Sequence, residues 1–118
     1  MKCKVEFLPG FWADYEAALR YISLILNNSI AARSLDAEFD RIVETVREFP
    51  RLSAPYPVKD ETGEEYRCFP VKNYLAFYVI RSAGNALQHG GQNEPDVVEF
   101  RRFLYAGSDI PSGRQWFP

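Results

Sequence analysis

The stretch YRCFPVKNYLAFYVI, residues 66–80, decides the fold of the C-terminal half of this chain. Most of its residues are β-branched or aromatic, which favours strands. Lys72-Asn73 divides it into two runs, and a two-residue division of this kind is typical of a β-hairpin. We therefore predict strands at 66–71 and 74–80 joined by a tight turn. Because Arg67 and the Lys72 of the turn are cations, their surroundings decide whether this hairpin faces an anion.

Upstream of this hairpin, apolar residues recur at steps of three and four, which predicts two amphipathic helices between Pro9-Gly10 and Pro50. Asn27-Asn28-Ser29 separates the two helices and supplies a helix cap. So short a connection predicts an antiparallel helical hairpin. The residues expected to face the core are Trp12, Tyr15, Leu19, Ile22 and Leu26 in the first helix, and Leu35, Phe39, Ile42, Val46 and Phe49 in the second.

Strands and loops complete the expected chain. Alternating polar and apolar residues at 2–7 predict a first strand, and VVEFRRFLY at 97–105 predicts a last one. Residues 50–65 are rich in proline and charge and are expected to form a surface loop, as are residues 81–96. The order predicts one α+β domain over 1–118, with an N-terminal strand, a helical hairpin and a three-stranded antiparallel meander. Both helices are expected on one face of a small sheet whose other face is open.

Composition narrows the class of protein. The chain has 118 residues, of which 47% are hydrophobic and 25% charged, as in an ordinary soluble globular domain. It has no apolar run near the roughly 20 residues that cross a bilayer and no signal-peptide pattern, so the cytoplasm is the expected location. With two cysteines and one histidine, neither a disulfide nor a metal site is expected. Lys and Arg outnumber Asp and Glu only after residue 65.

The usual enzyme signatures do not occur in the sequence: there is no Gly-rich phosphate loop, no Cys-x-x-Cys and no HExxH. His89 lies in a Gly-rich loop that is ill suited to position a base, and we interpret it as solvated. Helical spacing makes Trp12, Tyr15 and Phe39 core residues rather than a platform for bases. A solvated loop, rather than a metal site, is also the interpretation of Asp60, Glu61, Glu64 and Glu65.

Cations inside the predicted sheet are the strongest candidates for a site. Arg101 and Arg102 are adjacent in a strand, so one is expected to point toward the helices and the other toward the open face. The inward one needs a carboxylate such as Glu99 or Asp109. The outward one is expected to share a cationic, aromatic-lined surface with Arg67, Lys72, Tyr78 and Tyr105, which suits phosphates and bases. From the residues alone, these cations either form such a binding surface or serve as solvated or structural charge. The second interpretation is slightly favoured.

Four segments together resemble toxins of the RelE/ParE superfamily from type II toxin–antitoxin modules: DYEAALRYI, AARSLDAEFDRIVETVREFP, YRCFPVKNYLAFYVI and VEFRRFLYAGSDI. The resemblance covers nearly the whole chain. It implies a growth-inhibiting toxin that a cognate antitoxin holds inactive. RelE-type members cleave mRNA on the ribosome by acid–base and electrostatic catalysis without a metal or cofactor. ParE-type members poison DNA gyrase instead.

Carried over residue by residue, the resemblance implies catalytic roles for Arg67 and Tyr105 in a nuclease, and structural roles for Arg102 and Asp109. Binding of RNA or antitoxin is expected of Lys72, Tyr78, Arg101 and Arg102. Two positions depart from the pattern, because Leu75 and the turn Ala106-Gly107-Ser108 stand where basic residues are common. Ribosome-dependent cleavage is therefore favoured only slightly over gyrase inhibition. A degenerate toxin that only binds its antitoxin is the third alternative.

Overall fold

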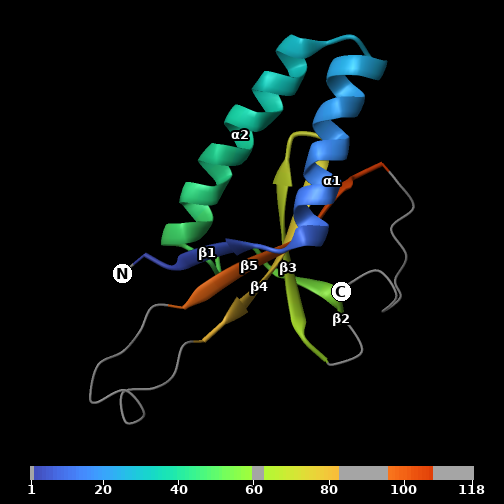
Figure 1. The fold of residues 1–118 in the computed structure, drawn as a ribbon. Helices are drawn as coiled ribbons and strands as arrows, with labels where there is room; N and C mark the ends of the chain where they lie inside the picture. Colours follow the sequence, from blue (N-terminus) through green and yellow to red (C-terminus); the bar gives the residue numbers. More distant parts are fainter. Residues whose placement is uncertain (1, 60–62, 83–95, 108–118) are drawn as a thin grey trace.

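A helical hairpin packed on a five-stranded sheet makes up the two layers of the molecule (Figure 1). The computed structural model describes residues 2–59, 63–82 and 96–107. Its elements are β1 (Lys4–Phe7), α1 (Pro9–Arg20), the π-helical turn η1 (Tyr21–Ile25), α2 (Ser29–Glu48), β2 (Pro55–Lys59), β3 (Glu65–Val71), β4 (Tyr74–Arg81) and β5 (Val97–Tyr105). The predicted α+β class, the helical hairpin and the strand meander are confirmed.

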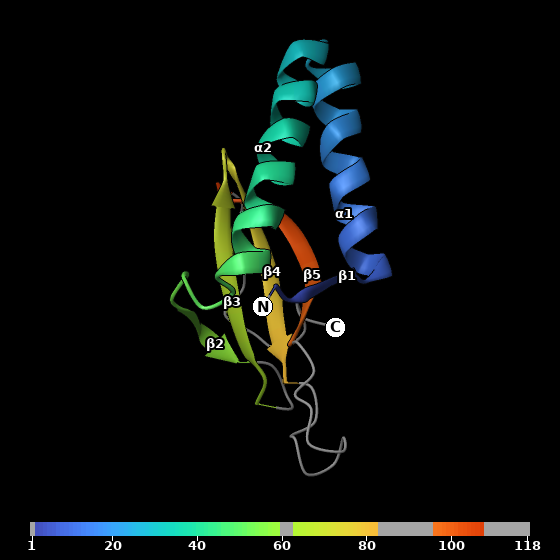
Figure 2. The same cartoon turned by 90° about the vertical axis from the view of Figure 1, so that its left-hand side faces the viewer.

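The strands lie in the order β1-β5-β4-β3-β2. All neighbouring pairs are antiparallel except β1 and β5, which run parallel and bring the first strand beside the last. In the β3–β4 hairpin Val71 pairs with Tyr74, so Lys72-Asn73 forms the predicted two-residue turn. Figure 2 shows the helical hairpin extending past the sheet, with its tip above this turn. The turn and the tip therefore lie at the same end of the molecule.

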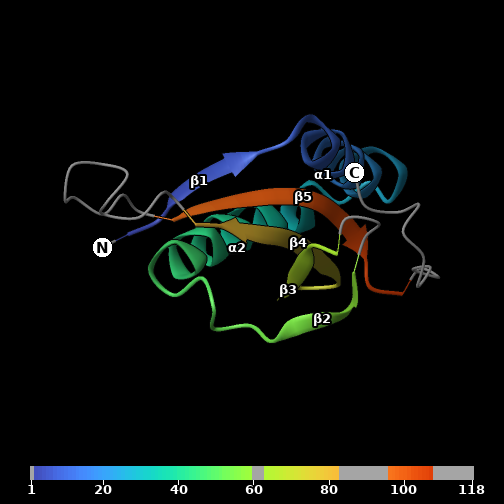
Figure 3. The same cartoon turned by 90° about the horizontal axis from the view of Figure 1, so that it is seen from below.

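The segment 50–65 differs from its prediction as a surface loop. Its residues Pro55–Lys59 form β2, which pairs with β3 at the outer edge of the sheet (Figure 3). Prolines at 55 and 57 lack the N–H that a central strand needs, but an edge strand tolerates them. The pairing is irregular between Pro55 and Lys59. The loop prediction is therefore wrong for these five residues.

Aromatic rings dominate the core between the helices and the sheet. Phe11 and Tyr15 of α1, Phe39 of α2 and Phe100 and Phe103 of β5 are all buried, and Phe11 lies 5.3–5.9 Å from the other four rings, centroid to centroid. Such contacts between rings add to the stability that burial itself provides. This cluster fixes α1 and α2 over β5.

The buried face of the first helix includes the predicted Tyr15, with Leu19 and Ile22 packed against the core, but it differs from the prediction at both ends. Phe11 is fully buried, whereas the predicted Trp12 is 43% exposed and Leu26 is exposed beyond the end of α1. On α2, Leu35, Phe39, Ile42 and Val46 are buried as predicted. Phe49 is exposed, because α2 ends one residue before it.

The sheet face away from the helices is not open, contrary to the prediction. Tyr66 of β3 and Phe77 of β4 are fully buried there, with Val79 and Leu104 beside them. Tyr56 of β2 packs edge-on against Phe77, with 5.1 Å between ring centroids. A second, smaller core therefore occupies the face on which an accessible cationic surface was expected.

Within the described residues, no helix combines the length and the apolar character needed to cross a membrane. Several predictions concern residues outside this part of the chain: the solvated loop at His89, the pairing of Asp109, and the state of Asp60 and Glu61.

Candidate functional site

Arg67 lies in β3, directly opposite Tyr78 of β4. Its guanidinium donates hydrogen bonds to the backbone carbonyl of Ser53 and to the Glu65 carboxylate, the latter at 3.3 Å. Only 13% of its side chain is exposed. Its charge is therefore directed at acceptors within the chain.

Tyr78 lies in the core under the segment that follows α2. Its hydroxyl lies 2.7 Å from the Ser53 hydroxyl and donates a hydrogen bond to the Pro50 carbonyl at 2.8 Å. Burial raises the pKa of Tyr78, although Ser53 and Arg67 act in the opposite direction. The structure thus encloses Tyr78 between the helices and the sheet, away from the surface to which its predicted binding role assigned it.

Arg101 is the extra residue of a β-bulge in β5. Tyr78 pairs with Phe100 and Phe77 pairs with Arg102, which leaves Arg101 without an opposite residue. The bulge breaks the strict alternation from which the opposite directions of Arg101 and Arg102 were predicted. Arg101 is 5% exposed and contacts the Tyr66 hydroxyl at 3.1 Å.

Two glutamates neutralise Arg101 in a closed network with Arg81. Arg101 donates to Glu64 at 3.0 Å and to Glu99 at 2.8 Å, and Arg81 binds the same two carboxylates at 2.9 Å each. Burial disfavours the charge on Arg101, but the hydrogen bonds that Arg101 donates to Glu99 and Tyr66 outweigh it and raise the pKa of Arg101. Glu64, predicted to be solvated, is therefore a structural ion-pair partner.

Arg102 is held by the helix layer. Its Nε lies 2.7 Å from one Asp14 oxygen and its Nη2 lies 3.2 Å from the other, a bidentate pair. Asp14 also accepts the backbone N–H of Phe103 at 3.0 Å. β1 pairs with β5 only as far as Phe100. Beyond that residue, Asp14 of α1 supplies the hydrogen-bond acceptor at the edge of β5. A carboxylate partner was predicted, but Asp14 was not among the candidates because it lies far away in sequence.

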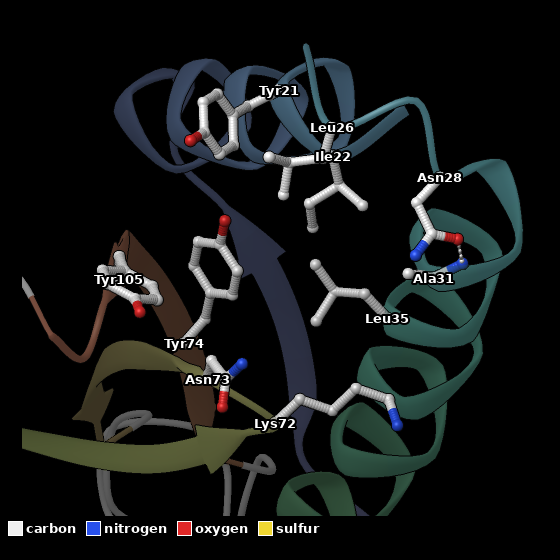
Figure 4. A pocket seen from close by; sticks show the side chains of 10 residues that line it. All are labelled: Tyr21, Ile22, Leu26, Asn28, Ala31, Leu35, Lys72, Asn73, Tyr74 and Tyr105. Atoms are coloured by element: carbon white, nitrogen blue, oxygen red, sulfur yellow. Dashed lines mark hydrogen bonds between the residues drawn. The ribbon is translucent and has the colours of Figure 1, made fainter. Parts of the chain in front are cut away.

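Lys72 and Tyr105 lie at the other end of the sheet, beside a groove that we call the tip groove. It is a cavity of about 520 Å³ between η1, the start of α2 and the β3–β4 turn, and Figure 4 shows its lining. The lining is mainly apolar and aromatic: Tyr21, Ile22, Leu26, Leu35, Tyr74 and Tyr105. The ring of Tyr74 meets that of Tyr105 at 5.6 Å. Sequence reasoning missed this groove: it assigned Leu26 to the core, where this side chain is instead exposed, and it could not place the β3–β4 turn beside η1.

The two predicted catalytic residues are not brought together. Arg67 pairs across the sheet with Tyr78, and Tyr105 pairs with Tyr74, four residues away along β4. At about 3.3 Å per strand residue, this separates them by about 13 Å along the strand. Among the predicted cations, Lys72 alone lines the tip groove together with Tyr105.

No group of three or more His, Cys, Asp or Glu side chains suited to a metal ion occurs in the described part of the chain. Cys3 and Cys68 are both free thiols. Burial raises the pKa of Cys68 to about 11, so its thiol is a poor nucleophile near neutral pH. The described residues thus contain an apolar groove and a set of arginines that are paired with carboxylates.

Comparison with known proteins identifies the family. The model for the ParE toxin of the type II toxin–antitoxin system parDE matches residues 5–104, from β1 to the penultimate residue of β5. A search of curated proteins found no match. Because the family match extends over most of the chain, the protein belongs to the ParE toxin family of type II toxin–antitoxin systems.

Proposed function

We propose that this toxin arrests growth by binding DNA gyrase and that it does not cleave RNA. The proposal rests on one observation: Arg67 and Tyr105 lie about 13 Å apart along the sheet, too far to act on one phosphate. The family match adds support, because gyrase inhibition is what the resemblance implies for ParE-type members.

Metal-free RNA cleavage requires an acid, a base and cationic groups around a single scissile phosphate. Each must come within about 3 Å of the reacting atoms, directly or through one water. Arg67 instead binds the Ser53 carbonyl and Glu65, and Tyr105 stands at the tip groove. A substrate that reached one of them would leave the other unused.

The remaining arginines give little support to phosphate binding. Arg81 and Arg101 share Glu64 and Glu99, so the four charges cancel. Arg102 is paired with Asp14. An RNA phosphate would have to displace these carboxylates, whereas RNA-binding surfaces attract phosphates with cations that are free to neutralise them. This favours a target that is recognised as a protein surface.

The test is incorporation of labelled thymidine and labelled amino acid in bacteria just after induction of the toxin alone. We expect DNA synthesis to fall first, in cells that express either the wild type or Arg67→Ala. Arg33→Ala, which removes an exposed cation of α2, is the matched control, and the melting temperature of each purified variant shows whether it folds.

Two other outcomes of the incorporation experiment would contradict the proposal. Translation that falls first, and recovers in a folded Arg67→Ala variant, would indicate the ribosome-dependent nuclease. If neither synthesis falls, the chain is a degenerate toxin that retains only its antitoxin partner. Inhibition of purified gyrase in a DNA supercoiling assay provides the direct confirmation.

A further inference from the structure

A second cavity, of about 390 Å³, opens between α1, α2 and the end of β1, and we call it the helix cleft. The two helices diverge from their connection toward β1, which leaves this space between them (Figure 1). Its lining comes from Phe7 of β1, Trp12 and Tyr15 of α1, and the side of α2 between Asp36 and Arg47. It shares no lining residue with the tip groove, and its volume falls in the range of small-molecule sites.

Aromatic rings form one wall of the helix cleft. The ring of Trp12 lies 4.9 Å from that of Phe7 and 6.0 Å from that of Tyr15, centroid to centroid, so its neighbours hold it in place. It nevertheless remains 43% exposed. The face of an indole attracts cations more strongly than other aromatic side chains do. In the described part of the chain no Lys or Arg lies over Trp12, whereas Arg101 lies over Tyr66 at 5.8 Å.

Two carboxylates of α2 line the same cleft without a cationic partner. Within residues 2–59, 63–82 and 96–107, neither Asp36 nor Asp40 forms an ion pair with a Lys or Arg. Asp36 accepts a hydrogen bond from the Tyr15 hydroxyl at 2.5 Å. Burial and the neighbouring Asp36 raise the pKa of Tyr15, so this hydroxyl is a neutral donor and does not cancel the charge of Asp36.

Glu44, the next carboxylate of α2 in the helix cleft, differs because its charge is compensated. Arg47 lies 3.4 Å and Lys2 lies 3.9 Å from it. The uncompensated charge of the cleft is therefore that of Asp36 and Asp40, which are one helical turn apart and so about 6 Å apart along α2. The two ammonium groups of an extended short-chain diamine are separated by a similar distance.

We propose that the helix cleft binds a linear aliphatic polyamine, with one ammonium group on each of Asp36 and Asp40 and the methylene chain against Trp12. The carboxylates provide charge complementarity, and the aromatic wall removes methylene groups from water. Both aspartates are exposed, so a ligand reaches them without a change in the fold. This inference concerns a small cation and does not rest on gyrase as the target.

Calorimetric titration of the full chain with spermidine tests the site. Asp36→Asn and Asp40→Asn are each expected to weaken binding about three- to fivefold, and the double variant at least about tenfold, because each change removes one partly exposed charge pair. Asparagine at position 36 keeps an acceptor for the Tyr15 hydroxyl, so the contact between α1 and α2 is retained. Glu48→Gln, an exposed change on α2 outside the cleft, is the matched control and should bind within about twofold of wild type.

A series of ligands distinguishes a polyamine site from a general attraction of cations. Butylamine has the carbon chain of putrescine but one charge, and Mg²⁺ has two charges but no chain. Both are expected to bind at least about tenfold more weakly than putrescine. Trp12→Leu should weaken spermidine binding about threefold, because leucine is apolar but lacks the attraction of the indole face. Spermidine should also raise the melting temperature of the wild type, by mass action, and not that of the double aspartate variant.

Unchanged affinity for spermidine in a double aspartate variant that is folded by circular dichroism would overturn the proposal. So would the absence of binding at millimolar spermidine, or binding of butylamine or Mg²⁺ as tight as that of putrescine. If oligoarginine binds and spermidine does not, the occupant is a basic segment of a protein and the proposal is again wrong. All of these measurements use the purified toxin alone, so failure of the gyrase proposal does not affect them.

Discussion

Burial of Arg101 on the sheet shows how one side chain can be cationic and yet unavailable to a ligand. Its charge is retained because Glu64 and Glu99 enclose it, and a buried ion pair tolerates the loss of one partner poorly. Burial disfavours the charge on Glu99, but hydrogen bonds from Arg101 and Arg81 outweigh it and lower the pKa of Glu99. Ionised Glu99 therefore stabilises the fold above pH 4.5, its ordinary value, and this contribution is lost as the pH falls through the lowered pKa.

Glu99→Gln is therefore expected to lower the free energy of unfolding by about 1–3 kcal/mol at pH 7, because Arg101 loses the charge of the Glu99 carboxylate. The deficit should shrink as the pH falls below 4.5 and through the lowered pKa of Glu99, because the wild-type carboxyl then becomes neutral as well. Urea denaturation at pH 7 and pH 3 measures both values. Glu16→Gln, an exposed change on α1, is the control and should stay within about 0.5 kcal/mol of wild type. An equal deficit at both pH values would contradict the role of the charge.

The contacts of single residues were the hardest feature to predict. The sequence identified the arginines of the sheet as cations that need a partner, but it did not identify the carboxylates that pair with them. Asp14, for example, lies 88 residues from Arg102. The bulge at Arg101 also breaks the alternation that a strand pattern assumes. Trp12 and Phe11 illustrate the same limit, since either residue has the spacing of three or four from the buried Tyr15 that a helix face requires.

At the scale of elements, the two helices and the β3–β4 hairpin follow from local signals. Pro50, the apolar spacing and the Lys72-Asn73 division each act within a few residues of the structure they specify. Asn28 caps α2 as predicted, accepting the N–H of Ala31 at 3.0 Å. β2 was missed, because a proline-rich edge strand depends on its neighbour rather than on its own sequence.

Removal of this cap gives a prediction for the start of α2. Asn28→Ala is expected to cost about 1 kcal/mol of stability, since the Ala31 N–H loses its acceptor. The melting temperature should fall by about 4 °C. Asn28→Asp keeps an acceptor and should melt close to wild type. If the two variants melt alike, the side-chain oxygen is not what stabilises the helix start.

At the scale of the whole molecule, stability is concentrated where β4 lies between β3 and β5. Phe77, Tyr78 and Val79 of β4 contribute to the cores on both faces of the sheet. The tip of the helical hairpin, in contrast, buries little of its apolar surface. The sheet order, with β1 beside β5, did not follow from the sequence, because it joins segments more than 90 residues apart.

Hydrogen exchange should show this difference in local stability between β4 and the tip of the helical hairpin. Backbone amides at the centre of β4 are expected to exchange slowest, near the rate set by global unfolding, and those of η1 fastest among the helical residues. Mass spectrometry after deuterium labelling resolves the two segments. Protection of η1 equal to that of β4 would show that the tip is as stable as the sheet.

The parallel pairing of β1 with β5 also sets the order of events during synthesis. The first strand leaves the ribosome early, but its only partner in the described sheet is the last strand to be made. A nascent chain that ends before Val97 has β1 and one edge of β4 unpaired, and unpaired strand edges promote aggregation. We therefore expect active toxin to form only after translation has passed β5, and we expect fragments made from truncated mRNA to be harmless to the cell that makes them.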